Sequence, residues 1–259
     1  MHHRPLIPIL LALAALLGAT AARGELTQSE GLQVAFGGGF SPSRLPRDRL
    51  APVTVRMKGS IGTTDGSEPP QLEHVSFAIN RHGKLFARGL PTCSAGLLQS
   101  TTNQAALARC RPALIGSGRF GAEVNLPSLP LVPVSGRLLA FIGRSEGRPE
   151  ILVHFYVAEP AQVTLVLPFK VTSQERGDFG TVLTAQIPKI AGSLGYVTNL
   201  SITIGRRYWF QGRLRSLFSA SCAAPAGFPG VLFNFARGNF YFANGQLLST
   251  TLTRDCRVG

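Results

Sequence analysis

Apolar and polar residues alternate along most of this 259-residue chain. Residues 150–158 show the pattern clearly, with an apolar set of Ile151, Val153, Phe155 and Val157. The residues between them are Leu152, His154 and Tyr156. A period of two residues places successive side chains on opposite faces of an extended strand. This segment is therefore predicted to be a β-strand with its more apolar face in the core.

Similar runs recur between segments rich in glycine, proline and asparagine, which mark turns. They predict further strands at residues 32–36, 53–61, 72–80, 113–123, 136–142, 163–172, 182–187, 196–204, 214–221, 231–243 and 246–253. Asn244-Gly245 separates the last two runs and predicts a hairpin. The pattern predicts an all-β fold, an antiparallel β-sandwich of jelly-roll-like type, with one short disulfide-clipped helical segment.

The stretch of residues 89–110 departs from this alternation and contains neither a β-branched run nor an internal proline after residue 92. It predicts a short helix over residues 103–109, because the hydroxyl of Thr101 or Thr102 can accept from the unpaired amides of a first helical turn. Pro112 cannot continue such a helix. The stretch is interpreted either as a structural crossover between two strands or as a lid that turns its polar residues toward a ligand. Those polar residues are Ser94, Thr101, Thr102, Asn103 and Gln104.

Residues 1–22 have the features of a secretory signal peptide: a weakly basic start, an apolar run and a small-residue cleavage site at Ala19-Thr20-Ala21. Cleavage is expected after Ala21 or Ala22, which leaves residues 23–259 as a single β-sandwich domain. The proline-rich residues 126–133 mark a second option, a division into two units. No later stretch is apolar enough to predict a transmembrane segment. The protein is therefore expected to be secreted or extracytoplasmic.

Export permits disulfides, and the chain has four cysteines, which allow three pairings. The sequential pairing is favoured because each bond then encloses a local unit. The predicted disulfides are Cys93–Cys110 and Cys222–Cys256.

The chain is strongly basic, with a formal net charge of +13. Such a surface favours an anionic partner, for which a cell-wall polymer or polysaccharide is the expected candidate. Nearly all of the cations are arginine, a bias that coding in a GC-rich genome also produces, and they are spread along the sequence. Charge alone therefore leaves two interpretations, a dedicated anion site or a merely soluble surface, and it does not predict specific binding of nucleic acid.

One cluster combines arginines with aromatic residues, including the only tryptophan in the chain. Its candidate binding residues are Arg206, Arg207, Tyr208, Trp209, Arg213 and Arg215. Arginine makes paired contacts with phosphate or carboxylate, and an aromatic ring offers a flat face to a sugar or base. The competing interpretation, which we prefer from sequence, is that Trp209 packs in the core while the arginines form a solvated strand face.

Motifs for catalysis, metals and cofactors are weak. His74, His82 and His154 lie on separate elements without metal-ligand spacing, so no metal is expected. The chain lacks G-x-S-x-G, and residues 116–121 match G-x-G-x-x-G but precede a strand-like run, which argues against a dinucleotide cofactor. Glu150 and Glu159 are too far apart along a strand to form a glycosidase pair. No catalytic residue or cofactor is predicted.

Four segments carry a resemblance to a family: SPSRLPRDRLAPVTVRMKGSIGTTDGSEPPQL, GLPTCSAG, CRPALIGSG and LSTTLTRDC. In these the chain resembles an uncharacterised family of exported, β-rich bacterial proteins with no assigned activity. The resemblance implies export and a β-rich fold, and it implies no catalytic residue. The expected function is thus a non-catalytic binding or structural role at the cell envelope. The alternative is a secreted hydrolase acting on carbohydrate, whose acids are brought together only by the fold.

Overall fold

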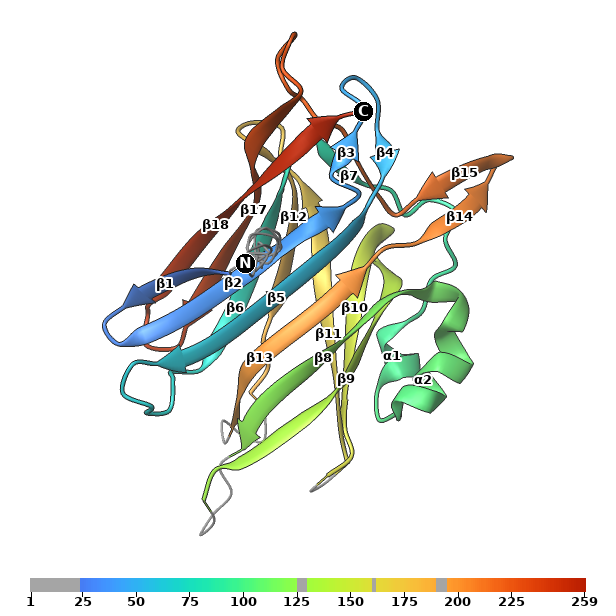
Figure 1. Cartoon of the computed structure of the whole chain (residues 1–259). Helices are drawn as coiled ribbons and strands as arrows, with labels where there is room; N and C mark the ends of the chain where they lie inside the picture. The colour runs from blue at the N-terminus through green and yellow to red at the C-terminus, as the bar shows by residue number, and fades with distance from the viewer. Residues whose placement is uncertain (1–23, 125–129, 160–161, 190–194) are drawn as a thin grey trace, which may run out of the picture.

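A computed structural model describes residues 24–124, 130–159, 162–189 and 195–259. Strands dominate it, so the all-β prediction is confirmed (Figure 1). In chain order the strands are β1 (Glu25–Ser29), β2 (Leu32–Ser41), β3 (Arg44–Leu45), β4 (Ala51–Pro52), β5 (Thr54–Thr63), β6 (Leu72–Asn80), β7 (Gly83–Leu85), β8 (Leu114–Val124), β9 (Val132–Ser145), β10 (Arg148–Val157), β11 (Val163–Ser173), β12 (Phe179–Gln186), β13 (Gly195–Ile204), β14 (Arg207–Phe210), β15 (Arg213–Ser216), β16 (Phe218–Ala220), β17 (Gly230–Phe242) and β18 (Leu247–Val258). The helices are α1 (Ala95–Leu98), α2 (Asn103–Cys110) and the 3₁₀ turn η1 (Arg111–Ala113).

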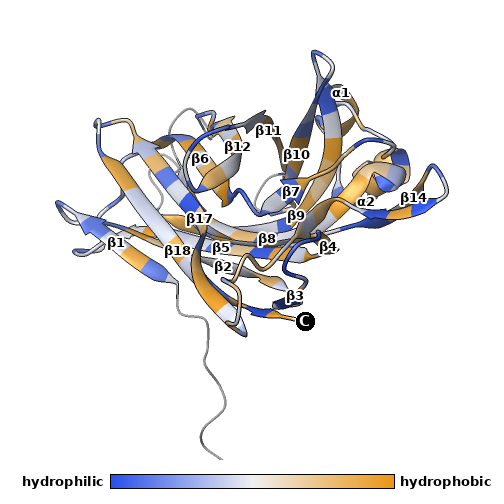
Figure 2. Ribbon diagram, turned by 90° about the horizontal axis from the view of Figure 1, so that it is seen from above, coloured by the Kyte–Doolittle hydropathy of each residue, from blue (hydrophilic) through white to orange (hydrophobic). Residues whose placement is uncertain are grey.

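Thirteen strands form one sheet, in the order β1-β2-β5-β13-β8-β9-β10-β11-β12-β6-β17-β18-β3. Every pairing in it is antiparallel except that of β18 with β3. The sheet curls strongly, so that its two halves face each other across the core (Figure 2). The ring of Phe36 on β2 stacks on Phe77 of β6 at 5.5 Å between centroids, although many strands separate the two in the sheet. The layered arrangement therefore comes from a single sheet that folds back on itself.

Strand β1, at one end of the sheet, meets β18, the last but one strand at the other end. The Thr27 hydroxyl on β1 donates to the Ser249 carbonyl of β18 at 3.3 Å, and it also contacts the Thr250 hydroxyl. Glu25 accepts from the Thr253 amide at 3.1 Å. These contacts hold β1 against β18 without a backbone ladder between them.

The helical segment covers the outward face of β9 and β10. Leu98 of α1 and Ala106 of α2 are completely buried there. Strands covered on both faces are apolar on both faces, and the buried runs 138–142 and 151–155 follow that rule except at His154. The helix predicted at 103–109 is confirmed as α2, and the Thr102 hydroxyl caps it by accepting from the Ala105 amide at 3.1 Å.

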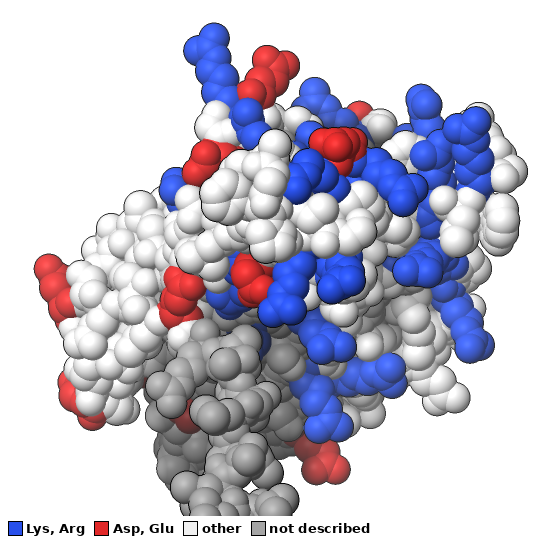
Figure 3. Space-filling view, turned by 45° about the horizontal axis from the view of Figure 1, so that its top comes forward, with Lys and Arg blue, Asp and Glu red and all other residues white. Residues whose placement is uncertain are grey.

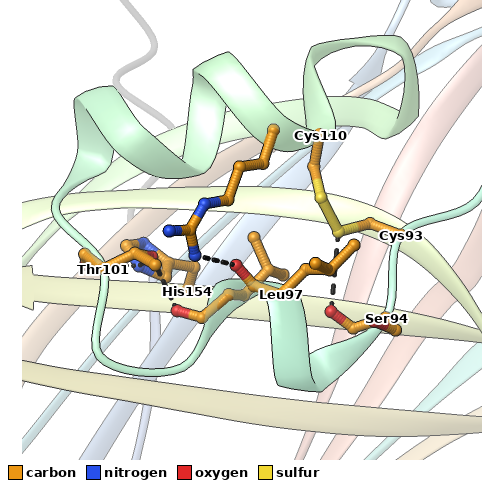
Figure 4. The surroundings of a disulfide bond; sticks show 8 residues. Cys93, Ser94, Leu97, Thr101, Cys110 and His154 are labelled. Carbon is orange, nitrogen blue, oxygen red and sulfur yellow. Dashed lines mark hydrogen bonds between the residues drawn. A yellow bond between two sulfur atoms is a disulfide. The ribbon is translucent and has the colours of Figure 1, made fainter.

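Both predicted disulfides are confirmed. Cys93–Cys110 joins the two ends of the helical segment (Figure 4). Cys93 also donates its amide to the Ile142 carbonyl at 2.9 Å, which attaches that end of the segment to β9. Cys222–Cys256 ties the chain before β17 to β18.

Predicted strand positions differ from the structure in a few places. Residues 72–80 coincide with β6 and Asn244-Gly245 joins β17 to β18 as a hairpin. The strand predicted at 214–221 is wrong, because β15 pairs with β14 as a separate hairpin and β16 joins β4 and β7. The predicted signal peptide and residues 126–129 of the predicted linker lie outside the described residues. No helix within the described residues is long and apolar enough to cross a membrane.

Candidate binding hairpin

The predicted arginine and aromatic cluster forms a small hairpin that projects from the body of the protein beyond the end of β13 (Figure 1). Strands β14 and β15 pair over four residues each and are joined by Gln211-Gly212. Both turn residues have positive φ, 50° and 68°, as the tight turn that matches strand twist requires. The hairpin is thus a separate two-stranded sheet, with one face toward the protein body and one toward solvent.

One face of the hairpin packs on residues 86–89. Phe210 contacts the Phe86 ring at 6.3 Å between centroids. The Tyr208 hydroxyl donates to the carbonyls of Phe86 and Arg88 at 3.0 Å and 2.9 Å, and burial raises the pKa of this phenol against the opposing effect of Arg215. Gly89 has φ +83°, and a Cβ on it would overlap the Phe210 ring, so this approach requires glycine.

The opposite face of the hairpin is open to solvent. Trp209 is 73% exposed and Leu214, directly opposite it on β15, is 51% exposed. The preferred prediction that Trp209 packs in the core is therefore wrong. The physical reason is the strand period: Tyr208 and Phe210 take the docking face, so the residue between them must point away.

The four arginines of the cluster differ in their contacts and exposure. Arg206 donates to the Leu114 carbonyl at 2.6 Å and so anchors the base of the hairpin. The Arg215 guanidinium lies over the Phe86 ring at 5.5 Å. Arg207 and Arg213 are exposed. The accessible part of the predicted cluster is therefore Arg207, Trp209 and Arg213, to which the structure adds Leu214.

A surface cavity of about 360 Å³ beside Cys222–Cys256 is lined by residues that include His82, Asp178 and Ser221. These are the residue types of a hydrolytic triad, but their contacts are different. The Asp178 carboxylate accepts from Asn234 Nδ2 at 3.1 Å, and Ser221 meets His82 through backbone atoms at 3.2 Å. Among the described residues no ion pair joins His82 to Asp178. These three residues therefore lack the hydrogen bonds that link nucleophile, base and acid in a catalytic triad.

At another point of the surface, burial and two carboxylates raise the pKa of one tyrosine, Tyr196. The Tyr196 hydroxyl donates to Glu123, and burial, this bond and the charges of Glu123 and Glu68 raise the pKa of Tyr196 to about 12. Glu68 and Glu123 are relevant to the hydrolase alternative, because the fold brings these two acids from separate parts of the sequence to the same residue.

The remaining histidines do not converge. His74 stacks against Tyr241 with centroids 4.9 Å apart, His82 lies in a turn, and His154 is buried under the helical segment. Within the described ranges, no group of three or more metal-ligating side chains is present.

The G-x-G-x-x-G match at residues 116–121 lies within β8. A Cβ on Gly118 would overlap the Ser201 carbonyl oxygen of β13. These glycines therefore permit a close approach of two strands, as their strand-like context predicted. Comparisons with family models, curated proteins and solved structures find no match to this chain.

Proposed function

We propose that this protein is an exported, non-catalytic protein that binds an anionic polymer of the cell envelope through the exposed face of the β14–β15 hairpin. The observation that carries the proposal is the exposure of Trp209, at 73%, beside Arg207. Leu214 extends the same face, whereas Arg213 is opposite Phe210 and lies on the other face beside the turn. We call Arg207, Trp209 and Leu214 the hairpin face.

A large exposed aromatic on a projecting hairpin is expensive to retain in water, since burying a side chain of this size is favourable by about 2–3 kcal/mol. A flat ring presented to solvent is suited to stacking on a sugar, and the neighbouring guanidinium group of Arg207 is suited to an oxyanion. An acidic glycopolymer offers both kinds of group in one chain. The hairpin face is therefore chemically complementary to such a polymer.

The charge distribution supports the same partner. Lys and Arg side chains gather over the centre and the right of the surface seen in Figure 3, the side on which Figure 1 places β14 and β15. The left of that view is mostly uncharged, with scattered acids. Removal of Arg4 with the signal peptide would leave +13 − 1 = +12, still strongly basic. This field raises the local concentration of a polyanion near the hairpin. Two disulfides fit the oxidising surroundings of an exported protein.

The experiment is binding of the mature chain to isolated cell wall, to a teichoic-type polymer and to DNA, each across a salt series. Trp209→Ala and Arg207→Ala test the hairpin face. Arg176→Ala removes another exposed arginine and is the matched control. We expect saturable binding to the wall or its polymer that the first two changes abolish and the control does not. Equal, weak binding to all three materials that fades with salt and ignores the substitutions would overturn the proposal.

A secreted carbohydrate hydrolase is the second candidate, favoured only by the approach of Glu68 and Glu123 to Tyr196. A general acid and a nucleophile or base are needed on either side of a glycosidic bond. The candidate predicts reducing-end release from wall polysaccharide that Glu123→Gln abolishes. Absence of release by the unmodified chain, under conditions where it binds the polymer, would exclude it.

A further inference from the structure

A row of exposed side chains crosses the outward face of the sheet below the hairpin. Lys58 on β5, Ser201 on β13, Arg119 on β8 and Arg137 on β9 are opposite one another in register. All four residues are exposed. Neighbouring strands lie about 4.8 Å apart, so the row from β5 to β9 is roughly 14 Å long. Three of its four members are cations.

Arg119 and Arg137 are directly opposite each other on neighbouring strands. Like charges in that position repel, and the repulsion destabilises the sheet. Among the described residues neither Arg119 nor Arg137 forms an ion pair with a carboxylate. The retained repulsion indicates an anion that both guanidinium groups bind together.

The row and the hairpin face are connected by two consecutive strands, β13 and β14. Ser201 in the row and Trp209 on the hairpin are eight residues apart along β13 and β14, which corresponds to roughly 26 Å of extended chain. Arg56, exposed and opposite Thr203, stands between them. Figure 1 shows β13 leading directly toward β14 on the same side of the molecule.

We propose that the row and the hairpin face form one continuous track for a single extended chain of the anionic polymer. In this track Arg119 and Arg137 hold one oxyanion of the polymer between them, Arg56 contacts the polymer midway, and Trp209 stacks on a sugar at the far end. This inference rests on the proposed function and specifies its ligand: a linear acidic glycopolymer with repeated oxyanions, bound along roughly 26 Å.

Two linked contact regions make binding depend on polymer length. An oligomer that reaches only the hairpin face gains nothing from the row, whereas a longer one engages both at a high effective concentration. Affinity therefore rises with length until the oligomer spans the track, and then levels off. Because exposed charges are screened by salt, the gain from length is largest at low ionic strength.

The test uses the full mature chain and a size-fractionated glycerol-phosphate polymer that carries sugar substituents, with fractions shorter and longer than the track, in titration calorimetry. The double variant Arg119→Ala, Arg137→Ala should weaken binding of long fractions by about tenfold or more and leave short fractions unchanged. Arg176→Ala is again the matched control.

A second variant separates binding from folding. Arg137→Glu converts the repulsive pair into an attractive one, so it should raise the melting temperature while it weakens binding of the long fractions. A loss of binding with a raised melting temperature cannot come from unfolding.

The outcomes distinguish this inference from the function on which it rests. If Trp209→Ala abolishes binding and the row variants do not change it, the track is overturned and the hairpin remains the site. If neither set of variants changes binding, both are overturned. If only the row variants matter, the hairpin is not part of the site and the track as stated is wrong.

Discussion

The Nε2 atom of His154 lies 3.0 Å from the carbonyl oxygen of Thr101 and 3.1 Å from its hydroxyl oxygen, beneath the helical segment (Figure 4). A carbonyl can only accept, so the neutral ring carries its hydrogen on Nε2 and donates it to this carbonyl. The Thr101 hydroxyl donates to the Leu98 carbonyl at 2.7 Å. The other ring nitrogen, Nδ1, is buried without a partner. Thr101 is therefore buried under the helical segment and does not face a ligand as the lid interpretation expected of it.

This contact makes stability depend on pH. Burial lowers the pKa of His154 below its ordinary 6.5, and the bond to Thr101 opposes that shift only in part. The unfolded chain then binds more protons than the folded chain below pH 6.5, so stability is fully present above that pH and falls as the pH falls toward the folded pKa. Urea unfolding between pH 7.5 and about 5 should show this decline.

The matched comparison for that decline is His154→Gln against His82→Gln, since His82 is exposed. The first change should remove most of the pH dependence and the second should leave it. An unchanged slope in the His154 variant would show that another group causes it.

The Cys93–Cys110 bond stabilises the helical segment by limiting the unfolded chain. The residues are 17 apart in sequence, for which chain entropy predicts about 3 kcal/mol, against about 4 kcal/mol for Cys222–Cys256 with its separation of 34. Replacing either pair by serine should lower the free energy of unfolding, and replacing Cys222 and Cys256 should lower it more. Equal stability of either variant and the parent in urea titrations would contradict the expectation.

Gly118 tests the close approach of β8 and β13. Gly118→Ala places a methyl group against the Ser201 carbonyl, where backbone must move, and should cost about 1–3 kcal/mol of stability. Gly96→Ala is the control, because a methyl group at that position would meet no other atom within 4 Å and alanine favours the helix that contains it. Thermal melts should show a loss for the first variant only. An unchanged melting temperature for Gly118→Ala would mean that the two strands can move apart without loss of stability.

The two faces of the hairpin should respond differently to truncation. Trp209→Ala removes little packing, since the side chain is 73% exposed, and should change stability by less than about 0.5 kcal/mol. Phe210→Ala removes the contact with Phe86 and should release the hairpin from residues 86–89. Hydrogen exchange at the Tyr208 and Leu214 amides would detect that release. Faster exchange in the tryptophan variant would contradict the division into a docked and an open face.

The strand pattern was sufficient to predict the class of fold, the helix α2 and both disulfides, because each depends on local periodicity or on nearby cysteines. It did not predict the covered outward face of β10. The signal was present in the unbroken apolar run 138–142 and in the run 151–155, apolar except for His154, which indicate burial on both sides. The turn at Gln211-Gly212 was missed because its flanking strands have only four residues each.

The cation row has no signal in the sequence at all. Arg119 and Arg137 come together only through the register of β8 with β9, and Lys58 joins them only because β13 lies between β5 and β8. A shift of one residue in either pairing would turn the arginines toward the core. Sites of this kind follow from sheet order, which a local pattern does not contain.

The most direct measurement of the central claim uses the fluorescence of Trp209, the only tryptophan in the chain. Its emission reports on the hairpin face alone, without a label. Addition of the teichoic-type polymer should shift the emission to shorter wavelength and reduce quenching by acrylamide, saturably and with the same midpoint as calorimetry. Polymer binding that calorimetry detects while the emission and the quenching of Trp209 stay unchanged would show that the hairpin is not the binding site.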